Sequence, residues 1–110
     1  MIISYADFEK VNLRSGTVVK AEPFTRARNP SYKVWVDFGE FGVKQTSAQC
    51  TVHYTCESLI GRQVIGCINL EPKNIAGFLS EFLLVGFPDS KGNVCLASAD
   101  PVVPNGQKLF

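Results

Sequence analysis

The sequence has few of the residues from which metal sites are built. It contains one histidine, His53, and its four cysteines form no C-x-x-C pair. Structural zinc sites usually take four ligands from closely spaced cysteines and histidines. The sequence therefore predicts no metal site and no cofactor. Cys67 and Cys95 lie in apolar runs and are expected to be small core residues.

Long apolar runs are also missing. No stretch reaches the roughly eighteen consecutive apolar residues that a membrane-spanning helix needs. The first ten residues, MIISYADFEK, carry charge and lack the apolar segment of a signal peptide. We expect a cytoplasmic protein with reduced thiols and no membrane span.

No catalytic constellation is recognisable. Ser47 and Ser80 lack a nucleophile-elbow sequence, and no glycine-rich phosphate loop of the usual spacing occurs. The neighbours of His53 offer no nucleophile, and nothing in the sequence pairs the glutamates. The sequence therefore predicts no catalytic residues and a protein that is not an enzyme.

The chain does contain enough apolar side chains for one core. Its 110 residues suit a single domain over residues 1–110, and 45% of them are hydrophobic. Net charge is only +1, yet the segment from Lys10 to Lys33 holds six cations against one anion, Glu22. Such a local excess suits a phosphate backbone, with a solvated surface as an equal alternative.

Short strand patterns follow one another along the chain. Ser4 and Asp7 resemble a helix capping box, and Gly16 suggests a bulge in the first strand. We expect a basic loop at 25–31, a short helix within 50–60, an extended tail with a turn at 105–106, and strands at 13–24, 32–38, 43–49, 62–70, 81–87 and 93–98. This pattern predicts a small all-β barrel or sandwich.

The strand expected at 81–87 is apolar on both faces. Phe82 and Leu84 point to one side, and Leu83 and Phe87 point to the other. A small barrel has only one interior, so the outer row needs a cover. The amino-terminal helix, the tail or a second subunit would provide it, and we favour a homodimer.

Two polar segments interrupt the apolar pattern. Residues 69–81 (NLEPKNIAGFLSE) are expected as a hydrogen-bonding loop, and residues 44–49 (KQTSAQ) as a strand with little apolar surface. Their donors and acceptors suit bases, ribose and phosphate, although an edge strand kept polar against aggregation is the alternative. Trp35 beside Lys33 suits base stacking, or else the indole packs in the core or in a dimer interface.

Three motifs and the tail together carry a family resemblance. DFEKVNLRSGTVVKAE (7–22), VDFG…GVKQTSAQ (36–49), INLEPKNIAGFLSEFLLVG (68–86) and the ending PVVPNGQK resemble the CsaA-type members of the tRNA-binding-domain family. The resemblance implies an OB-fold: a five-stranded Greek-key barrel with a short N-terminal helix and an extended C-terminal tail. It also implies a homodimer that binds tRNA or structured RNA without catalysis. CsaA proteins are further described as export-related chaperones that bind unfolded or precursor polypeptides.

Set beside this family, the two polar segments and the opening motif predict a set of RNA-binding residues: Arg14, Lys33, Lys44, Gln45, Ser47, Gln49, Asn69, Lys73 and Ser80. Glu81 is expected to orient Lys73 or a backbone amide, since a carboxylate repels phosphate. Phe78 and Leu79 are the candidates for the alternative, peptide binding. Many relatives carry a second cation where Asn74 stands and a polar or charged residue where Leu79 stands, which makes this segment less basic here.

Overall fold

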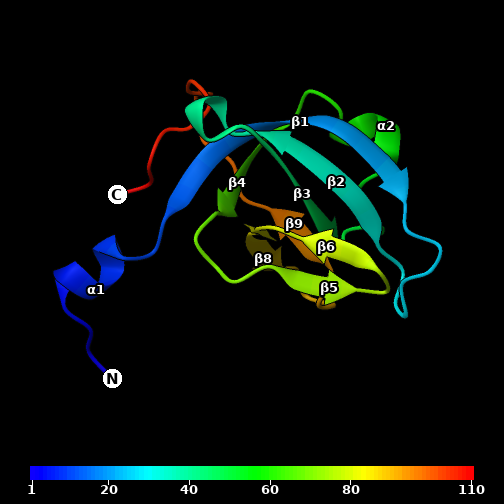
Figure 1. Ribbon diagram of the computed structural model, residues 1–110, viewed down its shortest axis with the longest axis horizontal. Helices are drawn as coiled ribbons and strands as arrows, with labels where there is room; N and C mark the ends of the chain where they lie inside the picture. The colour runs from blue at the N-terminus through cyan, green and yellow to red at the C-terminus, as the bar shows by residue number, and fades with distance from the viewer.

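The computed structural model describes residues 1–110, and its centre is a five-stranded antiparallel sheet. The sheet curls into a nearly closed barrel with the strand order β3-β2-β1-β4-β7 (Figure 1). These strands are β1 (Leu13–Pro23), β2 (Tyr32–Asp37), β3 (Val43–Ala48), β4 (Gln63–Cys67) and β7 (Leu83–Leu84). The barrel predicted from the sequence is confirmed.

Two hairpins and three short helices lie outside the five-stranded sheet. Two hairpins pair β5 (Lys73–Ile75) with β6 (Phe78–Ser80) and β8 (Gly86–Pro88) with β9 (Val94–Leu96). The helices are α1 (Tyr5–Glu9), α2 (Cys56–Leu59) and the 3-10 turn η1 (Gly39–Phe41). None of these helices has the length and apolar character needed to cross a bilayer.

The alternation in β2 fills the barrel interior. Val34, Val36 and Phe38 are fully buried and belong to a core cluster of eight residues. Gly16 on β1 faces them, and a Cβ atom there would lie 2.5 Å from Val36 Cγ1. The bulge predicted at Gly16 is wrong, because the β1–β2 register shifts between Val18 and Lys20 instead. Gly16 is needed for close packing of β1 on the core.

The stretch expected as a polar loop contains a hairpin, which corrects the sequence interpretation. Ala76 and Gly77 form its turn with φ values of 49° and 85°. Positive φ at both central positions is typical of the type I′ turn, whose twist matches that of the flanking strands. Asn74 supports the turn by accepting a hydrogen bond from the Gly77 amide at 3.0 Å. Lys73 and Ser80 therefore lie opposite each other on paired strands.

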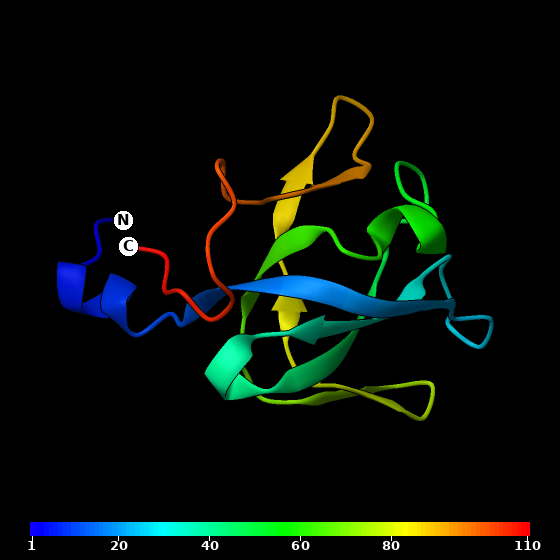
Figure 2. The same ribbon diagram turned by 90° about the horizontal axis from the view of Figure 1, so that it is seen from above.

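The single strand expected at 81–87 is interrupted. β7 pairs with β4, whereas β8 turns away to pair with β9. Phe82 is buried as predicted, but Leu83 is 52% and Phe87 70% exposed. α1 and the C-terminus lie together at one end of the molecule (Figure 2), and the hollow lined by Leu83 and Phe87 is bordered by no residue of α1 or the tail.

The termini confirm two local predictions. Ser4 and Asp7 form a complete capping box at the start of α1. The tail runs along the beginning of β1, with Gly106 and Gln107 bonded to Ser15 and a bridge between Arg14 and Lys108. The turn at 105–106 occurs as expected.

Candidate nucleic-acid interface

Two connections flank the outer face of β2 and β3. The basic loop (residues 25–31) joins β1 to β2, and the β5–β6 hairpin lies between β4 and β7. Lys33 pairs with Ser47 across the two strands, and Trp35 pairs with Gln45. OB-folds bind oligonucleotides on this pair of strands, between these two connections. The geometry therefore defines a candidate nucleic-acid interface, which we call the β2–β3 face.

An aromatic cluster fixes the hairpin to this face. Phe78 from β6 makes edge contacts with Phe24 at 5.4 Å and Trp35 at 5.9 Å between ring centroids. Lys33 Nζ lies 5.0 Å from the centroids of both Phe24 and Phe78, and Lys20 Nζ lies 4.6 Å from that of Trp35. Trp35 and Phe78 are half-buried. Phe78 is thus packed within the chain and is not a free anchor for a peptide.

Hydrogen bonds hold the hairpin against β3. The Glu81 carboxylate accepts from the Gln45 amide at 2.9 Å, and the Glu81 amide donates to the Gln45 carbonyl at 2.8 Å. The expectation that Glu81 orients a backbone amide is confirmed. The Gln45 side chain donates to the Leu79 carbonyl at 2.9 Å and accepts from the Trp35 indole at 3.2 Å. Gln45 therefore serves first to position the hairpin.

A pocket opens between β3 and the hairpin. Its volume is about 240 Å³, and Ser47, Lys73 and Ser80 contribute polar groups above an apolar floor that includes Phe82. The Ser80 hydroxyl contacts the Thr46 hydroxyl at 2.7 Å and accepts from the Ser47 amide at 3.2 Å. The structure thus brings together three of the predicted residues in one hollow.

Two other predicted residues lie elsewhere, in the framework. Arg14 Nε donates to the Asn12 side chain at 2.7 Å, its Nη1 donates to the Gly106 carbonyl at 3.0 Å, and the guanidinium stacks on Phe41. Asn69 donates to the Lys10 carbonyl at 2.7 Å and accepts from the Asn12 amide at 3.0 Å. Two of the five N–H groups of Arg14 and one of the two side-chain N–H groups of Asn69 are thus bonded within the chain, so both residues also serve to hold the framework.

The polar strand does not present a single row of donors. Lys44 pairs with the buried Val36, so its side chain leaves β3 on the same side as the buried Thr46. Ser47 leaves on the opposite side because side chains alternate along a strand. Gln49 follows the end of β3 and is exposed, with no side-chain hydrogen bond.

Two cations that the predicted site omitted flank the β2–β3 face. Arg26 and Arg28 lie in the basic loop, and both are exposed. Arg26 Nη1 is 3.9 Å from the position that a Cβ atom would take at Gly77, so the loop and the hairpin tip meet. The only ion pairs of the chain are Lys10–Asp7, Lys20–Glu22 and His53–Asp89. Position in the β1–β2 connection was the signal that could have identified these arginines.

Comparison with known proteins agrees with this geometry. Residues 13–108 match the family model described as "Putative tRNA binding domain". Crystal structures of chaperone CsaA from Bacillus anthracis and from Picrophilus torridus superpose with TM-scores of 0.94 and 0.92, at 43% and 36% identity. Those alignments cover 100% and 99% of this chain and all of the other.

The curated relatives are larger proteins. Methionine–tRNA ligases of Chlorobium chlorochromatii and Methanocaldococcus jannaschii are each 36% identical over 107 residues, which is 97% of this chain. The chain spans only about 15% of the length of these ligases. The fold and the β2–β3 face define an OB-fold binding module. The chain belongs to the tRNA-binding-domain family, and its full-length match to the two CsaA structures makes it a CsaA-type member.

Proposed function

We propose that this protein binds tRNA, or RNA of similar structure, on the β2–β3 face. One observation carries the proposal: cations from the basic loop, from β2 and from the hairpin surround an aromatic surface and have no acidic partner within ion-pair distance. These cations are Arg26, Arg28, Lys33 and Lys73. Unpaired Arg and Lys are the groups that displace counterions from phosphates. The family match supports RNA as the polyanion.

In this proposal the residues divide by what their polar atoms are free to do. Ser47 and Gln49 hydrogen-bond ribose or base edges next to the cations. The Ser80 hydroxyl is already bonded to the Thr46 hydroxyl and the Ser47 amide, so it mainly holds Ser47 in place. Lys44 leaves β3 on the other side and is not counted among the phosphate contacts of the β2–β3 face. Arg14, Gln45 and Asn69 hold the strands and hairpin in position and reach RNA less directly.

Binding of fluorescently labelled tRNA, measured by anisotropy at low ionic strength, tests the proposal. We expect saturable binding that unlabelled tRNA reverses and that an unstructured polypeptide does not. Absence of binding at low salt would contradict it. The nucleic acid that co-purifies with the protein provides an independent readout.

A polypeptide-binding chaperone is the second candidate. The CsaA structures matched over their full length are described as chaperones, and Leu79 at the hairpin is 45% exposed. Phe78 is packed between rings, so peptide contact there would rest mainly on Leu79. Apolar peptide binding should change little with salt and give a negative heat-capacity change, whereas RNA binding should weaken steeply with salt.

We propose a homodimer for either activity. α1 has no buried residue, and its Tyr5 and Phe8 rings lie 6.3 Å apart between centroids. A helix this short does not persist without tertiary packing. A cavity of about 560 Å³ next to the tail is lined by Ile65, Leu109 and Phe110, among others. A second copy would cover both, and a monomer mass by light scattering at micromolar concentration would refute this.

We further propose a single, non-catalytic domain that works in the cytoplasm. The likeness to the ligases covers a small part of their length, so their catalytic activity is not carried over. All four thiols are free, and Cys50 and Cys67 are buried, which fits a reducing compartment. Burial raises the pKa of the Cys50 thiol to about 11.

A further inference from the structure

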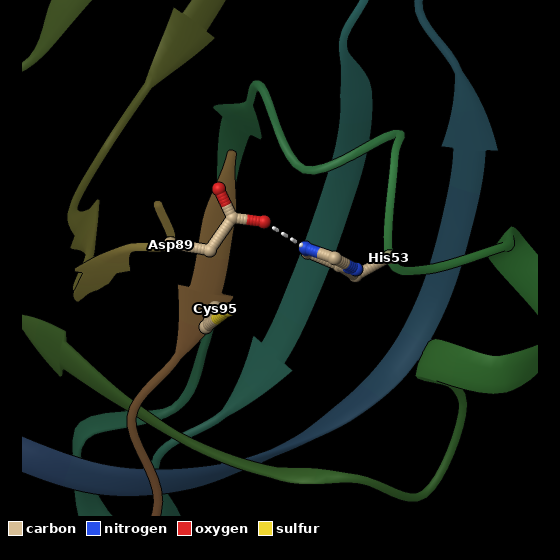
Figure 3. Close-up of side chains that lie close together, drawn as sticks. All are labelled: His53, Asp89 and Cys95. Atoms are coloured by element: carbon tan, nitrogen blue, oxygen red, sulfur yellow. Dashed lines mark hydrogen bonds and ion pairs between the residues drawn. The ribbon is translucent and has the colours of Figure 1, made fainter. Parts of the chain in front are cut away.

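A histidine, a carboxylate and a thiol lie together away from the β2–β3 face. His53 comes from the turn after β3, Asp89 from the turn between β8 and β9, and Cys95 from β9 (Figure 3). Their ligand atoms all lie within 4.8 Å of one another, and His53 Nε2 is 2.7 Å from Asp89 Oδ2. No local spacing predicts this group, since 36 positions separate the histidine from the aspartate.

The aspartate is oriented as metal-binding carboxylates are. Its Oδ1 accepts hydrogen bonds from the amides of Lys91 at 2.8 Å and Asn93 at 2.9 Å. These two bonds fix the carboxylate plane and leave Oδ2 directed at His53. Such supporting hydrogen bonds hold a ligand in place and raise the affinity of a metal site.

The donor set selects the ion. Nitrogen, carboxylate oxygen and thiolate sulfur together suit zinc, with bonds of about 2.0–2.3 Å and hence ligand separations of roughly 3.3–3.6 Å in a tetrahedron. The atoms here already lie within 4.8 Å. An ion would part His53 Nε2 and Asp89 Oδ2, now 2.7 Å apart, by roughly 0.6–0.9 Å and replace their hydrogen bond, and both residues lie in turns that can move. We propose that His53, Asp89 and Cys95 bind a zinc ion, with solvent in the fourth position.

The bound ion would join two parts of the chain that already touch. The Tyr54 hydroxyl accepts a hydrogen bond from the Leu96 amide at 2.8 Å, so the connector after β3 and strand β9 are held side by side without metal. Zinc therefore binds a nearly formed site and stabilises the β8–β9 hairpin against the barrel. The side chain of His53 is 42% exposed, which leaves a route for the ion and an open position of the kind that closed structural sites lack.

Cobalt and zinc themselves are the probes. The full-length chain, stripped with a chelator and kept reduced, is titrated with Co²⁺ and then with Zn²⁺. We expect one ion per chain, a thiolate-to-cobalt charge-transfer band and its loss on zinc addition. Cys95→Ser should abolish the band, and His53→Gln should weaken zinc binding at least about tenfold, the lower end of what even a supporting residue contributes.

Cys56→Ser is the matched control, because Cys56 is also half-exposed and lies outside the group. It should bind zinc as the wild type does. His53 is the only histidine, so its imidazole NMR signals report on the site without any substitution. Zinc that leaves these signals unmoved, or a Cys56→Ser variant that loses as much affinity as Cys95→Ser, would overturn the proposal.

Discussion

The sharpest test of the β2–β3 face is the salt dependence of tRNA binding after Arg26 and Lys73 are both replaced by alanine. Both side chains are exposed and lack ion-pair partners. Surface substitutions of this kind usually change stability by no more than about 0.5 kcal/mol. Changes in binding can therefore be assigned to the lost charges.

The expected magnitude follows from the number of cations. Four phosphate contacts per face, from Arg26, Arg28, Lys33 and Lys73, give a slope of log affinity against log salt of about −2.8 to −3.6. A fourfold rise in salt should then weaken wild-type binding by roughly 50- to 150-fold. With two contacts left, the slope halves and the same rise should cost only about 7- to 12-fold.

Anisotropy titrations of labelled tRNA at four or more salt concentrations measure these slopes. Lys73→Ala alone and Lys91→Ala form a matched pair, since each removes one exposed lysine and Lys91 lies in the β8–β9 turn. Lys73→Ala should lower the slope by about 0.7–0.9, and Lys91→Ala should leave it unchanged. If the double variant keeps the wild-type slope, or if Lys91→Ala lowers it equally, RNA does not bind at this face.

Three further predictions concern the framework. Gly16→Ala should destabilise the protein by about 1–3 kcal/mol in urea unfolding, because its Cβ would lie 2.5 Å from buried Val36. Unchanged stability would mean that the core can relax around the added methyl group. Gln45→Ala should lower tRNA affinity at every salt concentration, because it removes the hydrogen bond to the Leu79 carbonyl. It removes no charge, so the slope of log affinity against log salt should not change. A shallower slope would argue for direct phosphate contact. The Asp89 pKa falls to about 2, chiefly through the hydrogen bond with His53, so the stability that Asp89 contributes is complete above about pH 4 and is lost as pH falls toward 2. With chelator present, the free energy of unfolding of the wild type should exceed that of Asp89→Asn by an amount that shrinks over that pH range. A difference that stays constant with pH would contradict this.

The sequence predicted the elements whose causes are local. The capping box depends on Ser4 and Asp7, three positions apart, and the buried row of β2 depends on strict alternation from Val34 to Phe38. Both patterns can be read from residues that are close together in the sequence, without knowledge of contacts between distant segments. The β5–β6 hairpin was missed because its strands have three residues each and its turn is Ala76–Gly77 rather than the more common Asn–Gly.

The candidate site was harder to predict, because a side chain's chemistry does not reveal its partner. Asn69 and Gln45 carry the amides expected of RNA contacts, yet their bonds reach residues 59 and 34 positions away. Arg14 reaches across 92 positions to the tail. Only the fold shows that these groups bond within the chain and that Arg26 has no ion-pair partner.

The separation between residues that hold the framework and cations that are available to RNA follows from the small size of the chain. Only 16 of the 110 residues are buried, so the apolar core alone cannot fix long connections such as the β5–β6 hairpin. Polar ties from Gln45 and Glu81, together with the aromatic contacts of Phe78, do this at the edge of the core. A hairpin held in this way keeps Lys73 at a fixed position before RNA binds. The favourable electrostatic free energy of binding is therefore not offset by the entropy cost of ordering the loop. The Gln45 side-chain amide, which the sequence suggested as an RNA contact, thus holds the hairpin in place, and this allows Lys73 to act as an RNA contact.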